Sequence, residues 1–150
     1  MTLHLREAAK EDMDTIFYWA NEETVRKNAF HTEPIPYENH VAWYTTRLAD
    51  EDCYIFLLET EEEGIGQIRF DIEDGIATID YSVAVPMRGK GYGTRLVQMG
   101  MENLTKRRPD VKEYLGQVKY ENFSSAKVFE KCGFTREEKA AYIEFKKRVG

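Results

Sequence analysis

The stretch from Val83 to Thr94 constrains the fold more than any other part of the chain. A run of β-branched residues ends near Pro86, three glycines follow at alternate positions, and an amphipathic pattern then begins. This order predicts a strand, a tight loop and a helix, with Gly89, Gly91 and Gly93 in the loop. Such loops bring several backbone N–H groups together at a helix N-terminus, where an anion binds. The sequence therefore predicts a site for a phosphate-bearing ligand.

Other known phosphate-binding motifs do not fit this loop. No glycine precedes Gly89-Lys90 at the distance that a Walker A loop requires, and the last glycine of a G-x-G-x-x-G fingerprint is missing. A tight connection without a ligand is the alternative. It would not need three glycines in five positions beside the two cations Arg88 and Lys90.

Length and charge limit the class of protein. The 150 residues, 42% of them hydrophobic and 32% charged, predict one globular domain over residues 1–150. A net charge of −6 makes nucleic acid and anionic membranes unexpected partners. The first residues carry no signal-peptide pattern, so we expect a cytoplasmic protein. Cys53 and Cys132 lack CxxC spacing and are expected to be reduced core thiols.

Hydrophobic periodicity predicts the order β-α-α-β-β-β-α-β-α-β, with a further strand near the end. Three consecutive hairpin strands that feed a crossover helix imply a mixed sheet with helices on both faces. Asp74-Gly75 is a strong hairpin signal between two of these strands. The expected strands are residues 3–8, 53–58, 66–72, 76–85, 114–118 and 142–145, and the expected helices begin near 10, 41, 96 and 123.

A second motif, Asn122 to Phe134, follows the fifth expected strand. It resembles the N-x-x-[AS]-x-x-[LV]-[YF]-x-x-x-G-F segment of the GNAT acyltransferases. Arg88-Gly89-Lys90-Gly91-Tyr92-Gly93 resembles the R/Q-x-x-G-x-G/A loop of the same family. The likeness implies a single-domain α+β fold with a mostly antiparallel sheet of about seven strands. It also implies an N-acetyltransferase that moves the acetyl group from acetyl-CoA directly to a primary amine.

The resemblance assigns most of the cofactor-binding residues to the loop. Backbone N–H groups from Arg88 to Thr94 would bind the pyrophosphate, and Val83 and Val85, on the fourth strand, would pair with the pantetheine arm. Asn122 would contact the pantetheine or thioester region, or only cap the last helix. The complete expected set is Val83, Val85, Arg88, Gly89, Lys90, Gly91, Tyr92, Gly93, Thr94, Asn122, Ser125 and Phe129.

Catalysis needs a group that removes a proton from the amine and a group that meets the departing thiolate. The resemblance makes Asp80 on the fourth strand the candidate base, because many family members carry an acidic or water-holding residue there. An aspartate on an exposed face of the strand is the alternative. Phe129 stands where many family members carry a tyrosine, and it has no proton to donate. Tyr120, Tyr142 and Ser125 are candidate substitutes. No cluster of His, Cys, Asp or Glu has metal-ligand spacing, so no metal is expected.

The acceptor side is expected in the first helices. The residues from Trp19 to Trp43 resemble family members that acetylate amino sugars on nucleotide carriers, such as those of the pseudaminic acid pathway. On this reading the substrate-binding residues are Trp19, Arg26, Phe30, His40 and Trp43, with stacking aromatics and a cation for the diphosphate. Alternatively, the aromatic residues belong to the core and His40 binds a backbone carbonyl.

The sequence leaves two further functions open. One is acetylation of a protein N-terminus, as in ribosomal-protein acetyltransferases, and the other is a CoA-binding sensor with little activity. The expected partner is a small-molecule amine, and a homodimer stays open.

Overall fold

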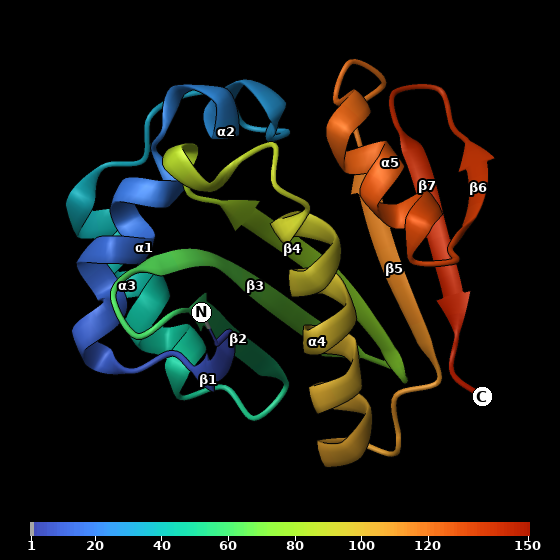
Figure 1. Cartoon of the computed structure of the whole chain (residues 1–150), viewed down its shortest axis with the longest axis horizontal. Helices are drawn as coiled ribbons and strands as arrows, with labels where there is room; N and C mark the ends of the chain where they lie inside the picture. Colours follow the sequence, from blue (N-terminus) through green and yellow to red (C-terminus); the bar gives the residue numbers. More distant parts are fainter. Residues whose placement is uncertain (1) are drawn as a thin grey trace.

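The computed structural model describes residues 2–150 and contains one open sheet of seven strands in the order β1-β2-β3-β4-β5-β7-β6 (Figure 1). Neighbouring strands are antiparallel except β4 and β5, which are parallel. The strands are β1 His4–Glu7, β2 Cys53–Glu59, β3 Gly64–Glu73, β4 Ile76–Val83, β5 Glu113–Val118, β6 Thr135–Glu138 and β7 Ile143–Arg148. The helices are η1 Lys10–Asp12, α1 Met13–Ala20, α2 Glu23–Asn28, α3 Tyr37–Leu48, η2 Val85–Met87, α4 Tyr92–Arg107 and α5 Phe123–Lys131.

The two parallel strands separate along their length. Pairing between β4 and β5 runs from Ile76 opposite Glu113 to Ile79 opposite Gly116. Beyond that point β4 stays paired to β3 up to Val83, and β5 stays paired to β7. One edge of the second half of β4 therefore faces a gap and not a neighbouring strand, as Figure 1 shows between β4 and β5.

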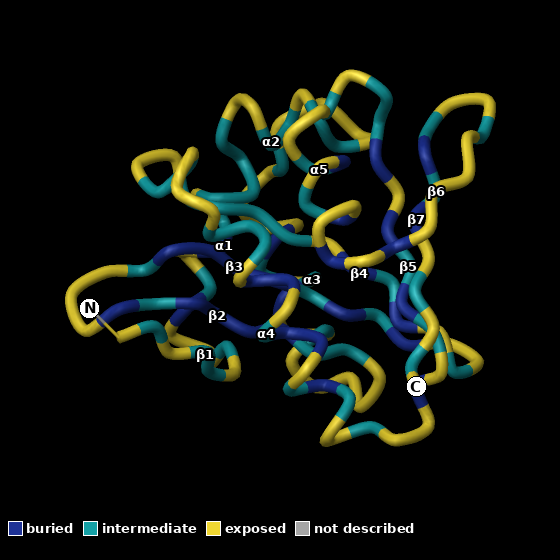
Figure 2. The backbone as a smooth tube through the Cα atoms, turned by 45° about the vertical axis from the view of Figure 1, so that its right-hand side comes forward, coloured by how far each residue is buried: buried dark blue, intermediate teal, exposed yellow. Residues whose placement is uncertain are grey.

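Helices cover both faces of the sheet and make two cores. On one face α4 and α5 pack on the central strands, where the largest cluster of buried residues includes Phe70, Leu96 and Phe145. On the other face α1 and α3 cover a smaller cluster built around Tyr44 and Ile55. Figure 2 shows the buried segments concentrated along the central strands, whereas α2 contains no buried residue.

Local sequence explains how the strands that form the gap are placed. Asp74 and Gly75 both have positive φ, 52° and 76°, as the tight β3–β4 turn requires. α4 returns the chain to the sheet, and its Gly100 lets the helix approach closely, because a Cβ there would lie 3.1 Å from Ile68 and Phe70. The crossover through α4 then makes β5 parallel to β4.

The expected fold class is confirmed, and two boundaries are corrected. The fourth strand ends at Val83, so the placement of Val85 on that strand was wrong. Ala84 donates the last ladder hydrogen bond, to the Ile65 carbonyl, and Pro86 has no N–H to continue it. Val85 instead begins η2 and is 54% exposed. The helix expected from Lys10 is interrupted at Asn21, and α2 follows as a separate helix.

Both cysteines are free thiols in the structure, Cys132 buried and Cys53 partly so. Burial raises the pKa of the Cys53 thiol to about 12, and the nearby Asp71 carboxylate acts in the same direction. Neither thiol is therefore activated as a nucleophile. Within residues 2–150, no helix combines the length and the apolar character needed to cross a membrane.

Candidate active site

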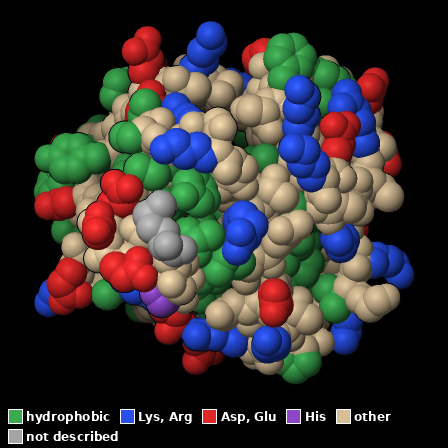
Figure 3. All heavy atoms as spheres, viewed as in Figure 1, with side chains coloured by type: hydrophobic (Ala, Val, Ile, Leu, Met, Phe, Trp, Pro, Cys, Tyr) green, Lys and Arg blue, Asp and Glu red, His purple; other side chains and the backbone are tan. Residues whose placement is uncertain are grey.

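A cleft with a volume of about 450 Å³ opens where β4 and β5 separate. Its walls come mainly from α2, the second half of β4, the loop that leads into α4, and α5, with Gln67 of β3 and Gln117 of β5 between them. On the surface in Figure 3, Lys and Arg side chains lie on both sides of a hollow between the regions of α2 and α5. The cleft therefore joins the glycine loop and the Asn122 motif in one site.

The glycine loop has the conformation that an anion site needs. Gly89 and Gly91 have φ values of 76° and 82°, in the left-handed region that favours glycine. A Cβ at either position would have no heavy atom within 4 Å, so the backbone conformation and not crowding requires glycine. Gly91 caps α4 without a side-chain hydrogen bond, which leaves the first N–H groups of the helix available to a ligand.

The Arg88 side chain points across the cleft to the acceptor side. Its Nε donates to the Val83 carbonyl at 3.0 Å, and its Nη2 lies 2.7 Å from Glu22 Oε1. Glu22 also caps α2 by accepting from the N–H groups of Thr24 and Val25. Burial opposes the charge of Glu22, but these hydrogen bonds and Arg88 lower its pKa. Arg88 thus connects the glycine loop to α2. Lys90, the other cation expected to bind the phosphate, is exposed and is not part of the cleft lining.

The start of α5 forms the opposite wall. The Asn122 side chain caps the helix by accepting from the Ser125 N–H at 3.3 Å, and both residues line the cleft. The capping role is therefore present, and contact of Asn122 with a ligand stays a prediction. Tyr81 on β4 donates to Ser125 Oγ at 3.0 Å. Burial raises the pKa of Tyr81 to about 12.

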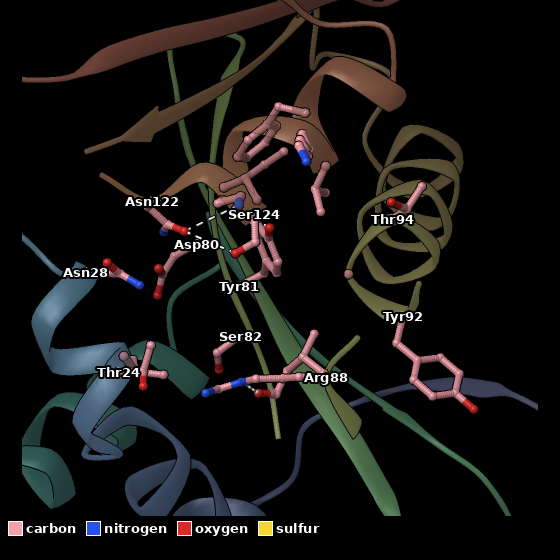
Figure 4. Close-up of a pocket in the computed structure, with 18 of the residues that line it drawn as sticks. Thr24, Asn28, Asp80, Tyr81, Ser82, Arg88, Tyr92, Thr94, Asn122 and Ser124 are labelled. Carbon is pink, nitrogen blue, oxygen red and sulfur yellow. Dashed lines mark hydrogen bonds between the residues drawn. The ribbon is translucent and has the colours of Figure 1, made fainter. Parts of the chain in front are cut away.

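Asp80 lies inside the cleft on the face of the sheet that α1 to α3 cover. Figure 4 shows Asn28, Asp80 and Asn122 directed toward one another from α2, β4 and the loop before α5. Arg69, opposite Asp80 on β3, approaches its carboxylate to 3.4 Å while Asp80 keeps 60% of its side chain exposed. Burial opposes the charge of Arg69, but Asp80 and Asp71 outweigh it and raise its pKa. Asp80 is thus held in place and still accessible.

The structure does not bring the other candidate catalytic residues to the cleft. The Tyr120 hydroxyl donates to the Lys139 carbonyl, and the Tyr142 ring packs against Phe30 with centroids 5.8 Å apart. Neither tyrosine is part of the cleft lining, whereas Ser125 and Phe129 are. Tyr81 was missed, because its core-facing position on an alternating strand indicated packing only.

Four of the five expected substrate-binding residues lie away from the cleft. The His40 ring nitrogen Nε2 is 2.9 Å from the Met13 carbonyl oxygen, and His40 is 2% exposed. Trp19 packs against Gly64, and Trp43 lies beneath Arg69 with 5.0 Å between guanidinium carbon and ring centroid. The rings of Trp19 and Trp43 bury more apolar surface in the core than they would on a cleft wall. The alternative, in which these two residues are core aromatics, is therefore correct. Phe30 is exposed and touches Tyr142.

Arg26 does line the cleft, but its guanidinium is already used. It donates to the carbonyl oxygens of Ala20, His31 and Glu33. These bonds engage Nε and Nη1 and hold α2 to the segments around it. The acceptor side of the cleft carries four neutral polar side chains beside the apolar residues of α2, namely Thr24, Asn28, Gln67 and Ser82.

Within residues 2–150, no group of three or more His, Cys, Asp or Glu side chains is arranged to hold a metal ion.

A cleft between diverging parallel strands, with a glycine-capped helix N-terminus at its mouth, is a binding site that suits a phosphate-bearing ligand. The sequence profile of the acetyltransferase (GNAT) domain matches residues 2–135, and the chain belongs to that family. It is thus an acetyl-CoA-dependent N-acetyltransferase of the GNAT type. No curated protein matches the sequence.

Solved structures share the fold at low sequence identity. The spermidine N-acetyltransferase of Vibrio cholerae, in complex with CoA and spermine, is 18% identical with a TM-score of 0.86 over 97% of this chain and 95% of its own. A ribosomal L7/L12 α-N-protein acetyltransferase with CoA is 17% identical, with a TM-score of 0.84 over 99% and 95% of the two chains. The aminoglycoside acetyltransferase AAC(6′)-Ib with CoA is 19% identical, with a TM-score of 0.81 over 98% and 95%. These three proteins act on different amines, so the likeness does not determine the acceptor.

Proposed function

We propose that the protein transfers the acetyl group of acetyl-CoA directly to the primary amine of a small, hydroxyl-bearing acceptor such as an amino sugar. The observation that carries the proposal is the convergence of the glycine-capped N-terminus of α4 and the accessible Asp80 on one cleft. Direct transfer is favoured because the two thiols are not activated for an acyl-enzyme.

The residues of the cleft fit acetyl-CoA as the donor, which supplies an acetyl group activated as a thioester. The N–H groups that follow Gly89 and Gly91 would hold the pyrophosphate. Lys127 and Lys131 on α5 add positive charge to the same mouth of the cleft. Asp80 to Val83 present the open edge of β4, to which the amides of the pantetheine arm would bind as an added strand does.

Asp80 is proposed as the base. An alkylammonium ion must lose a proton before its nitrogen can attack, and a positioned carboxylate accepts that proton directly or through water. The ion pair with Arg69 fixes the orientation of the Asp80 carboxylate, and the exposed fraction leaves it open to the acceptor. Asn28 and Asn122 lie around it and offer amide groups to the incoming amine.

The chemistry of the acceptor wall favours hydroxyl groups over phosphates or several positive charges. Thr24, Asn28, Gln67 and Ser82 are neutral hydrogen-bonding side chains, and Asp80 is the one carboxylate among the residues that line the cleft. A nucleotide carrier needs free cations for its diphosphate, and Nε and Nη1 of Arg26 are bonded to carbonyls. An amino sugar fits this wall better without the nucleotide than with it.

The test is acetyl-CoA-dependent thiol release with a panel of amines. The panel compares free amino sugars, nucleotide-linked amino sugars, polyamines and peptide N-termini, with mass spectrometry of each product. We expect free amino sugars to give the highest kcat/KM. A preference for peptides or nucleotide sugars would overturn the acceptor class, and CoA binding without turnover on any amine would leave the sensor as the function.

A further inference from the structure

A row of charged side chains leads from Asp80 away from the cleft. Arg69 Nη1 lies 3.4 Å from Asp80 Oδ2, and Arg69 Nε donates to Asp71 Oδ2 at 2.9 Å. The other oxygen of Asp71, Oδ1, accepts from Arg47 Nη1 at 2.9 Å. Two carboxylates and two guanidinium groups therefore alternate along this row, and of the four residues only Asp80 lines the cleft.

Strand geometry fixes the order of these charges. Arg69 and Asp71 are two positions apart on β3, so their side chains point to the same face of the sheet. Asp80 is the residue directly opposite Arg69 on β4. Arg47 comes from α3, which packs on this face. Arg69 is therefore placed between the two carboxylates by the register of β3 and β4.

Trp43 on α3 holds both guanidinium groups from the side. The guanidinium carbon of Arg69 lies 5.0 Å from the centroid of the Trp43 ring, and that of Arg47 lies 5.9 Å from it. Cations at such distances are attracted to the face of an indole ring. The Arg69 side chain is 24% exposed, against 60% for Asp80. Arg69 is thus the fixed member of its pair with Asp80.

Arg69 contacts its two carboxylates unequally. The contact with Asp71 is a hydrogen bond of 2.9 Å, whereas the contact with Asp80, at 3.4 Å, is an ion pair without hydrogen-bond geometry. A carboxylate that accepts hydrogen bonds from a guanidinium group takes up a proton less readily and is a weaker base. Because Asp71 accepts the short hydrogen bond, the Asp80 carboxylate stays available to a proton.

We propose that Asp71 is a positioning residue for the base Asp80. By accepting from Arg69 Nε, Asp71 keeps the guanidinium at a distance from which it orients the Asp80 carboxylate without hydrogen bonding to it.

The inference rests on the proposed acetyl transfer. Asp80 takes a proton from the acceptor ammonium, directly or through water. The neutral nitrogen then bonds to the carbonyl carbon of the thioester, and the carbon–sulfur bond breaks with its electron pair on sulfur. The second proton passes from nitrogen to the thiolate through solvent.

The first test needs no turnover. Asp71→Ala removes both oxygens that hold the two arginines, and we expect the freed guanidinium of Arg69 to turn to Asp80. A crystal structure of this variant should show two hydrogen bonds between Arg69 and the Asp80 carboxylate, which is the geometry that the two groups favour. An Arg69 that keeps its wild-type position would overturn the inference, because Asp71 would then not be the residue that holds it.

The second test is the pH profile of kcat/KM with the best amine of the panel. Close pairing with a guanidinium group lowers the pKa of a carboxyl group by about one to three units. The acid limb of Asp71→Ala should therefore lie about one pH unit below that of wild type. The weaker base should also lower kcat by roughly three- to tenfold. The amine is the same in every assay, so its own ionisation cancels.

Other ionisable groups near Asp80 are the same in Asp71→Ala and in wild type. Cys53 on β2 lies opposite Asp71, and its pKa, raised to about 12, keeps it a neutral thiol. The remaining groups line the cleft or flank it, and they are Arg26 on α2, Tyr81 on β4, Arg88 in the glycine loop, Tyr92 on α4, Lys119 after β5, Lys127 and Lys131 on α5, and Glu144 on β7.

A double-mutant comparison separates the position of Arg69 from the charge of Asp71. Loss of the Asp71 carboxylate removes a negative charge near Asp80, which shifts the acid limb in the same direction. In the background of Arg69→Gln, which has no guanidinium to release, Asp71→Ala should shift the acid limb far less. An equal shift with and without Arg69 would overturn the inference and leave Asp71 with an effect of charge alone.

Arg47→Ala is the matched control. It removes the other hydrogen bond of Asp71 and leaves the bond between Asp71 and Arg69 in place. Its acid limb should not fall below that of wild type, and the Tm values of the two variants report the folding cost that they share. An acid limb lowered as far as in Asp71→Ala would show that any break in the row has this effect, which contradicts the role of Asp71.

These measurements separate the inference from the proposed function. If the wild type acetylates an amine and Asp71→Ala keeps both its acid limb and its kcat, the role of Asp71 is wrong and acetyl transfer stands. Failure of the wild type to acetylate any amine would count against the proposed function itself. The position of Arg69 in the crystal structure of Asp71→Ala then still supports or overturns the hold of Asp71 on Arg69.

Discussion

The two sides of the cleft are built in different ways. The donor side, from Gly89 through the start of α4, offers backbone N–H groups whose positions depend on two left-handed glycines. The acceptor side, α2 with the outer half of β4, depends on side chains, several of which already bond to one another or to carbonyls. A site made of backbone tolerates many side chains but few backbone changes. A site made of side chains changes its specificity when one residue is replaced.

The largest effect is expected on the donor side from Gly91→Val. A β-branched residue at φ 82° is strained, so the start of α4 must shift and its N–H groups no longer converge. We expect CoA affinity to fall by about 100-fold or more, which corresponds to about 3 kcal/mol, as measured by calorimetry.

Gly75→Val is the matched control, since Gly75 also has positive φ but lies in the β3–β4 turn. It should lower Tm and leave CoA affinity unchanged. Wild-type affinity in Gly91→Val would show that the donor side does not rely on the backbone of this loop.

The next largest effect concerns chemistry on the acceptor side. Asp80→Asn keeps the shape of the side chain but removes the proton acceptor, and loss of general base catalysis costs roughly 100-fold or more in rate. We expect kcat to fall by that amount while CoA affinity changes less than twofold. A kcat within threefold of wild type would assign proton removal to solvent.

A smaller effect is expected where the two sides meet. Glu22→Gln keeps an oxygen for the α2 cap but removes the charge that faces Arg88, at a cost below about 1 kcal/mol for a partly exposed pair. Amide exchange in α2 should become faster at neutral pH. The pKa of Glu22 is lowered in the folded state, so its contribution is present at neutral pH and disappears as the pH falls through that lowered pKa.

Glu23→Gln, on the same helix and exposed, is the control for this comparison. If amide exchange in α2 is equally fast in Glu22→Gln and Glu23→Gln at every pH, Arg88 does not anchor the helix.

The smallest effect on activity is expected from Tyr120→Phe. Its hydroxyl holds the Lys139 carbonyl, so its loss should cost about 1 kcal/mol of folding free energy, measured by thermal unfolding. Activity should stay within twofold of wild type. A loss of kcat above tenfold would restore the catalytic role that the sequence suggested for this tyrosine.

The contrast between the two sides also explains what could be predicted from the sequence. Gly89 and Gly91 reveal the donor side because left-handed backbone demands glycine, and the spacing survives in the sequence. The alternating strands and the Asp74-Gly75 turn indicated the sheet for similar local reasons. Asn122 was recognised through the likeness to the family's N-x-x-[AS] segment, and the capping role expected as its alternative is present in the structure.

The acceptor side could not be predicted in this way. Trp43 and His40 have the chemistry of binding residues, but only the tertiary packing of α3 shows that they are used inside the core. The same holds for Arg26, whose bonds to three carbonyls come from loops that the sequence does not place. Tyr81 faces α5 from a strand, and its partner Ser125 lies 44 positions away in the chain.

The most direct test of the proposed CoA site is a crystal structure of the protein with CoA bound. We expect the pyrophosphate on the backbone N–H groups between Gly89 and Thr94, and the pantetheine along the open edge of β4. The sulfur should lie in the gap between β4 and β5, on the path to Asp80. Pyrophosphate bound elsewhere, or a sulfur directed away from Asp80, would contradict this arrangement.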